Sequence, residues 1–166
     1  MMEGQDNSKK SRCIRVELIY YLHDRGSYEP IYEYKKGSIS EDEIYARQLC
    51  TYFIKNGVQY KLVCNEGTVN NNTETLTVER DDLARNFYKE KTYPEGIHME
   101  FREFKYLQDM PLLHTEALES HWQALKFLLK DVVHIPGVGE CHVDSTEIDE
   151  DRQCYVFYIG KMVKEE

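Results

Sequence analysis

The sequence predicts an α+β protein in which a mostly antiparallel sheet carries two main helices on one face. Segments of alternating apolar and polar residues follow one another through short turns, which favours antiparallel pairing. Two longer segments have apolar residues at helical spacing instead. The 166 residues suit one domain, and 41% hydrophobic with 31% charged residues is the composition of a folded chain with a heavily charged surface.

The N-terminal region predicts a tail and a strand pair. Residues 1–12 are polar and lack the apolar segment of a secretory signal, so we expect a disordered tail before a single domain over residues 13–166. Ile14–Leu22 and Ile31–Lys35 alternate in polarity and are separated by a turn at Gly26.

The next segment predicts a helix from Glu41 to Lys55. Ser40 and Glu43 have the spacing of a capping box, and apolar residues then recur at helical spacing. Asn56-Gly57 is interpreted as the end of this helix, because both residue types tolerate a left-handed backbone.

The middle of the chain predicts further strands. Val58–Asn65 and Thr75–Glu79 alternate in polarity, and Asp81–Tyr88 is interpreted as a short helix. Ile97–Tyr106 is strand-like, but its apolar residues change parity, which predicts a bulge near Arg102–Glu103.

The C-terminal region predicts a second helix and three more strands. The helix, Thr115–Lys130, follows a connector at Asp109–His114. The strands are Val132–Ile135, Val138–Ile148 and Cys154–Met162. The predicted order is therefore β-β-α-β-β-(α)-β-α-β-β-β. Strand pairs after both helices suggest two similar halves, although the residues themselves do not repeat.

Charge and cysteine content bound the function classes. The net charge of −9 argues against general nucleic-acid binding and against docking on an anionic membrane, and it is compatible with a basic protein partner. No apolar run is long enough to span a membrane. The five cysteines form no CxxC pair, and Cys50 and Cys64 are expected to be buried free thiols, which suits a cytoplasmic location.

Motifs for catalysis or metal binding are missing. The sequence has no GxGxxG, P-loop, GxSxG, HExxH or EF-hand pattern, which favours a non-catalytic protein without proving it. His114 and His121 are seven residues apart, roughly 10 Å along a helix, which is too far for one metal ion. We therefore expect no metal and no cofactor.

The main functional hypothesis is an acidic protein-interaction module that regulates or inhibits another protein. A basic protein is the candidate partner. Tyrosine is enriched at binding surfaces, and an acidic turn offers charge to such a partner. The alternatives are that the tyrosines belong to the core and that the acidic segment is simply solvated. The candidate partner-binding residues are Tyr28, Tyr32, Tyr34, Glu147, Asp149, Glu150 and Asp151.

The alternative hypothesis is a small-molecule-binding domain or enzyme with a cavity between helix and sheet. His98, Glu100 and Glu103 lie on the irregular strand and would supply its polar groups. A homodimer is compatible with either hypothesis.

Overall fold

Ten strands and two helices make up the described part of the chain. The computed structural model describes residues 17–81, 91–106 and 109–162. In chain order its elements are β1 (Glu17–Asp24), β2 (Ser27–Tyr34), α1 (Glu41–Leu49), β3 (Tyr52–Lys55), β4 (Val58–Gly67), β5 (Thr73–Arg80), β6 (Ile97–Glu103), β7 (Leu112–Leu118), α2 (His121–Leu128), β8 (Val132–Ile135), β9 (Gly139–Asp149) and β10 (Cys154–Met162).

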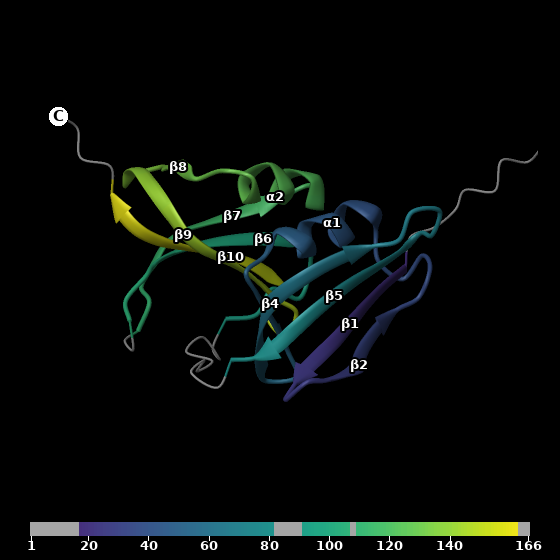
Figure 1. Ribbon diagram of the computed structural model, residues 1–166. Helices are drawn as coiled ribbons and strands as arrows, with labels where there is room; N and C mark the ends of the chain where they lie inside the picture. The colour runs from purple at the N-terminus through teal and green to yellow at the C-terminus, as the bar shows by residue number, and fades with distance from the viewer. Residues whose placement is uncertain (1–16, 82–90, 107–108, 163–166) are drawn as a thin grey trace, which may run out of the picture.

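All described strands belong to one sheet, in the order β2-β1-β5-β4-β3-β9-β10-β6-β7, with β8 paired to β9 (Figure 1). Six strand pairs are antiparallel, and three are parallel: β1 with β5, β3 with β9, and β10 with β6. The α+β class and the mostly antiparallel sheet are therefore confirmed. No helix in the described residues is long and apolar enough to cross a membrane.

The sheet consists of two halves with the same connectivity. β1-β2-α1-β3-β4-β5 and β6-β7-α2-β8-β9-β10 are both ββαβββ units, and each strand pair of the first unit has a counterpart of the same sense in the second. The halves join where β3 runs parallel to the end of β9, while β8 pairs with the beginning of β9. The two helices therefore come to lie side by side (Figure 1).

The main core lies between the sheet and the helices. Leu18 on β1 and Phe157 on β10 are fully buried in the same hydrophobic cluster as Ile44 and Ala46 from α1 and Ala124 from α2. Neighbouring residues of a strand point to opposite faces. Accordingly, the alternate residues of β10 form a second, smaller cluster on the other face, which comprises Cys154, Val156 and Tyr158 with Tyr93 and Met110.

The predicted helix Glu41–Lys55 is too long. α1 ends at Leu49, Cys50 is already extended, and β3 (Tyr52–Lys55) follows. Asn56 and Gly57 do adopt left-handed backbone angles, with φ of 51° and 73°, but they form the two-residue turn of the β3–β4 hairpin. Asn-Gly favours this hairpin turn because both positions require positive φ.

The predicted helix Thr115–Lys130 begins too early. Residues Leu112–Leu118 form β7, an edge strand paired with β6, and α2 covers only His121–Leu128. Pairing with β6 outweighs the local helical periodicity here. The predicted bulge is present as a register shift between Phe101 and Arg102, although β6 ends at Glu103.

The predicted tail, short helix, capping box and buried cysteines compare with the structure as follows. The tail at 1–12 and the helix at 82–88 lie outside the described residues. Ser40 occupies the N-cap position of α1 without a side-chain cap hydrogen bond, so the capping box does not form. Cys50 is buried as expected, but Cys64 is exposed.

Candidate functional site

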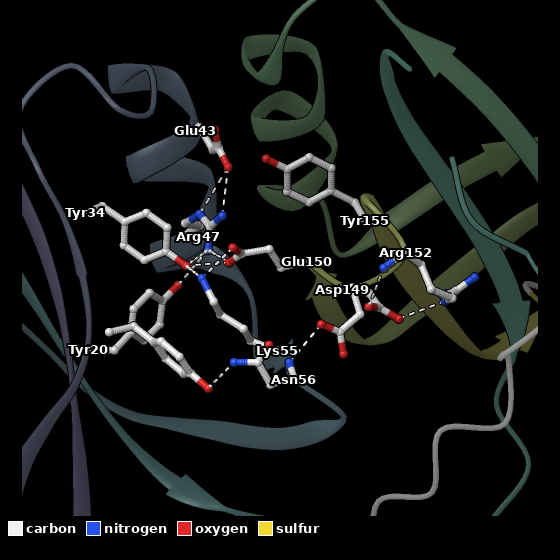
Figure 2. Close-up of polar contacts among 12 residues, drawn as sticks. Tyr20, Tyr34, Glu43, Arg47, Lys55, Asn56, Asp149, Glu150, Arg152 and Tyr155 are labelled. Atoms are coloured by element: carbon white, nitrogen blue, oxygen red, sulfur yellow. Dashed lines mark hydrogen bonds and ion pairs between the residues drawn. The ribbon is translucent and has the colours of Figure 1, made fainter. Parts of the chain in front are cut away.

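A network of charged and phenolic side chains lies where the two halves meet. The first half contributes β2, α1 and β3, and the second contributes α2, β10 and the turn between β9 and β10. Figure 2 shows Arg47, Lys55 and Glu150 at its centre, with Tyr155 approaching from the second half.

Arg47 is the buried centre of this network, with only 3% of its side chain exposed. Its Nη2 and Nε donate to Oε1 of Glu43, one helical turn earlier, at 2.8 and 3.2 Å. Its Nη1 donates to Oε2 of Glu150 at 3.2 Å and to the hydroxyl of Tyr34 at 3.4 Å. A buried guanidinium needs such partners, because its desolvation is otherwise costly. Arg47 therefore fixes α1 against the β9–β10 turn.

Lys55 occupies a cage of two tyrosine rings and one carboxylate. Its Nζ lies 4.8 Å from the ring centroid of Tyr32 and 4.9 Å from that of Tyr34, and it donates to Oε1 of Glu150 at 2.7 Å. Tyr34 donates its hydroxyl proton to Oε2 of Glu150. Burial opposes ionisation of Glu150, but Arg47 and Lys55 outweigh this and lower the pKa of its carboxyl below the ordinary value. Glu150 is therefore a carboxylate at neutral pH.

His121, the first residue of α2, connects the helices to the sheet. Its Nδ1 lies 2.7 Å from the hydroxyl of Tyr155, and its Nε2 lies 3.4 Å from Oε2 of Glu43. Burial raises the pKa of Tyr155 well above that of a free phenol, so Tyr155 stays protonated. Asp42 completes this link by accepting the backbone N–H of Trp122 at 3.0 Å.

A cavity of about 380 Å³ opens beside this network. Residues of both halves line it, from the ends of β2 and β9, from α1, from the beginnings of α2, β6 and β10, and from the β9–β10 turn. Its polar lining consists of Tyr34, Glu43, Arg47, His121, Asp149, Glu150, Gln153 and Tyr155. In the described part of the chain, no group of three His, Cys, Asp or Glu residues is arranged to hold a metal ion.

The structure brings part of the predicted partner surface together. Tyr34 contacts Glu150, and the hydroxyl of Tyr32 accepts a hydrogen bond from Asn56 at 3.2 Å. The backbone N–H groups of Asn56 and Gly57 both donate to the carboxylate of Asp151 at 2.7 Å. Tyr32, Tyr34, Glu150 and Asp151 thus surround the β3–β4 hairpin turn.

The other predicted surface residues lie elsewhere. Tyr28 is 64% exposed at the far end of β2, where it stacks on His23. Glu147 and Asp149 have no exposed surface, and they bind Tyr158 and Arg152 respectively. In this structure the acidic segment is therefore divided between the interior and the junction.

The alternative pocket residues are also divided. Glu100 is fully buried, and it accepts hydrogen bonds from Arg102 at 2.8 Å and from Arg152. His98 stacks on Tyr93, with ring centroids 4.4 Å apart, whereas Glu103 is exposed beside Lys105. Glu100 thus belongs to a buried ion network on the face of the sheet opposite to the helices.

A second concave surface is formed by side chains of α1 and α2 together with one residue of β4. This surface, the α1–α2 groove, has a volume of about 550 Å³ and is lined by Glu41, Asp42, Tyr45, Gln48, Leu49, Asn65, Trp122 and Leu125. Trp122 is 55% exposed. Trp122 lies within the predicted helix Thr115–Lys130, but local sequence patterns do not single out Arg47 or Lys55, because their partners are distant in sequence.

Comparison with known proteins identifies no relative: no family model, no curated protein and no solved structure matches the chain. The geometry of the two concave surfaces is therefore the basis for inferring a function.

Proposed function

We propose that the chain is a protein-interaction module that regulates or inhibits a partner by binding a basic, amphipathic segment of it in the α1–α2 groove. The observation that carries this proposal is the position of Trp122, the only tryptophan of the chain, which is more than half exposed within a concave apolar surface. Tryptophan in such a position is the residue type most enriched in binding hot spots.

The middle of the groove is apolar and its ends are polar. In the middle, Tyr45 and Leu49 of α1 face Trp122 and Leu125 of α2. Tyr45 and Leu49 are 38% and 39% exposed, so this apolar surface is accessible. Exposed apolar surface that gathers in one place usually marks an interaction site.

The ends of the groove differ in charge. Glu41 and Asp42 lie in the first turn of α1, whereas Gln48 and Asn65 lie at the other end and hydrogen-bond to each other at 3.1 Å. The ring of Trp122 already attracts one cation, since Nζ of Lys126 lies 5.9 Å from it. The acidic end and the net charge of −9 therefore favour a partner segment with Lys or Arg at one end.

The shape of the groove favours a helical segment. α1 has nine residues and therefore extends for about 13 Å, which matches two to three turns of another helix. Two neighbouring helices offer ridges and grooves into which a third helix packs. Such partners present apolar residues at positions i, i+3 or i+4, and i+7.

Selection from a displayed random-peptide library, followed by titration of the enriched peptides, tests the proposal. We expect enrichment of apolar residues at helical spacing with Lys or Arg near one end, and a blue shift of Trp122 fluorescence on binding. By calorimetry, Trp122→Ala should weaken binding at least tenfold, because it removes the largest apolar contact. Glu41→Lys should also weaken it.

The matched controls are Tyr28→Ala, an exposed aromatic residue outside the groove, and Glu29→Lys, an exposed carboxylate on β2. Both should bind the peptides as the unchanged protein does. Peptides whose affinity is the same for Trp122→Ala and the unchanged protein would refute the groove as their site. Self-association that Trp122→Ala abolishes would instead identify a second copy of the chain as the occupant.

A further inference from the structure

The cavity at the junction of the two halves is separate from the α1–α2 groove. The two share no lining residue, and they lie on different sides of the first turn of α1, with Glu41 and Asp42 on one side and Glu43 on the other. A ligand in this cavity would contact both halves, and junctions of this kind are common places for small-molecule sites.

Two carboxylates are more accessible in this cavity than the guanidinium that pairs with them. The side chains of Glu43 and Glu150 are 16% and 28% exposed, whereas that of Arg47, which neutralises them from behind, is 3% exposed. Oε1 of Glu43 is occupied by Arg47. Its Oε2 accepts no hydrogen bond from the residues that the structure describes, and its contact with Nε2 of His121 is long, at 3.4 Å.

The remaining lining suits an apolar group of moderate size. Ile39, Ile97 and Ile148 provide aliphatic surface, and Tyr34 and Tyr155 provide aromatic rings. A volume of about 380 Å³ is within the range of sites for small organic ligands. Aromatic rings together with carboxylates are the combination that binds organic cations, as the enclosure of Lys55 by Tyr32, Tyr34 and Glu150 shows within this chain.

We propose that the junction cavity binds a small organic ammonium ion with an apolar body. The ammonium group donates to Oε2 of Glu43, and the apolar body lies against the isoleucine and tyrosine side chains. Figure 2 shows Glu43 on α1 in the first half, with Tyr155 of the second half pointing toward it and Glu150 of the second half reaching Arg47 beside it. This binding site is independent of the partner-binding function proposed for the α1–α2 groove.

Three probes of similar size and different charge test this proposal: 2-phenylethylamine, 2-phenylethanol and phenylacetate. Titration into the ¹⁵N-labelled protein, followed by amide chemical shifts, gives both affinity and location. We expect saturable shifts with the amine at Gly96, Ile97 and Gln153. The alcohol should bind at least about tenfold more weakly, because it lacks the charge-assisted hydrogen bond, and the carboxylate should not bind.

Variants test which residues bind the amine. Glu43→Gln should weaken amine binding about tenfold, whereas Glu41→Gln, two residues earlier but in the groove, should leave it unchanged. Because Glu43→Gln also removes a partner of Arg47, Ile39→Phe serves as a second variant that fills the cavity and keeps its carboxylates. It should abolish binding.

Equal affinity for the amine and the alcohol would overturn the proposal, as would shifts at Tyr45, Leu49 and Trp122 instead of at the junction. Failure of the amine to bind at millimolar concentration would also overturn it. None of these outcomes affects the peptide experiment on the groove.

Discussion

Glu147 offers a quantitative test of the buried electrostatics. Its side chain has no exposed surface, Oε1 accepts a hydrogen bond from Tyr158 at 2.9 Å, and Oε2 has no hydrogen-bond partner among the described residues. Burial, followed by the charge of Asp149, raises the pKa of Glu147 from 4.5 to about 8. Between these two values the folded protein therefore holds a proton that the unfolded chain releases.

The sign of the effect on stability follows from this difference. Because the folded state binds more protons than the unfolded state in this window, the free energy of unfolding falls as pH rises. The shift from 4.5 to about 8 corresponds to a loss of at most about 5 kcal/mol over the window. Glu147→Gln keeps an acceptor for Tyr158 and cannot ionise. The free energy of unfolding of this variant should therefore not show the decrease that ionisation of Glu147 causes as pH rises.

Urea unfolding at pH 5, 6, 7 and 8, followed by circular dichroism, measures the difference. The stability of Glu147→Gln relative to the unchanged protein should increase steadily across the series, by several kcal/mol in total. Glu29→Gln, which changes an exposed carboxylate on β2, is the control and should run parallel to the unchanged protein. If Glu147→Gln also runs parallel, Glu147 does not hold a proton in the folded state and the reasoning is wrong.

Two further predictions concern the junction network. Arg47→Met should lower the free energy of unfolding by roughly 3 kcal/mol, because it leaves Glu43 and Glu150 without their buried cation. Arg25→Met, at a side chain that is 96% exposed, should change it by less than about 0.5 kcal/mol, and equal effects of the two would contradict the central role of Arg47. The lowered pKa of Glu150 means that its stabilisation is present above its unfolded pKa and is lost as pH falls through the folded value. Urea unfolding between pH 5 and pH 3 should therefore show a smaller loss of stability for Glu150→Gln than for the unchanged protein, and the same loss in both would contradict the ion pairs with Arg47 and Lys55.

The elements with strong local signals could be predicted from the sequence. The alternation within β1, β4, β5 and β10 and the periodicity of α1 follow from side-chain direction within each segment. β3 could not be separated from the helix before it, because Tyr52 and Phe53 follow Leu49 at helical spacing. β7 is defined by its pairing with β6, which is a contact between segments and leaves little trace in local periodicity.

The contacts within the candidate site could not be predicted from the sequence either. Tyrosine content and the acidic turn led to the choice of Tyr34 and Glu150 as candidates, but the sequence could not show that they are in contact, because 116 residues separate this pair. Glu147 and Asp149 lie in a segment whose composition is that of a solvated strand, yet both are buried, where Tyr158 donates to Glu147 and Arg152 pairs with Asp149. Which carboxylates are buried therefore depended on partners in three dimensions.

The two halves indicate which of these charges the architecture requires. Ser40 and Ser120 occupy equivalent N-cap positions of α1 and α2, so Asp42, Glu43 and Arg47 correspond in helical position to Trp122, Gln123 and Phe127. The second ββαβββ unit thus builds the same connectivity with neutral residues at these three positions.

The charges of α1 are therefore not needed to form a ββαβββ unit. A buried ion network also contributes less to stability than well-packed apolar residues of similar volume. Both concave surfaces arise at these unequal positions, since Trp122 shapes the α1–α2 groove and Glu43 and Arg47 line the junction cavity. This departure from equivalence between the halves supports the two proposals that these places bind ligands.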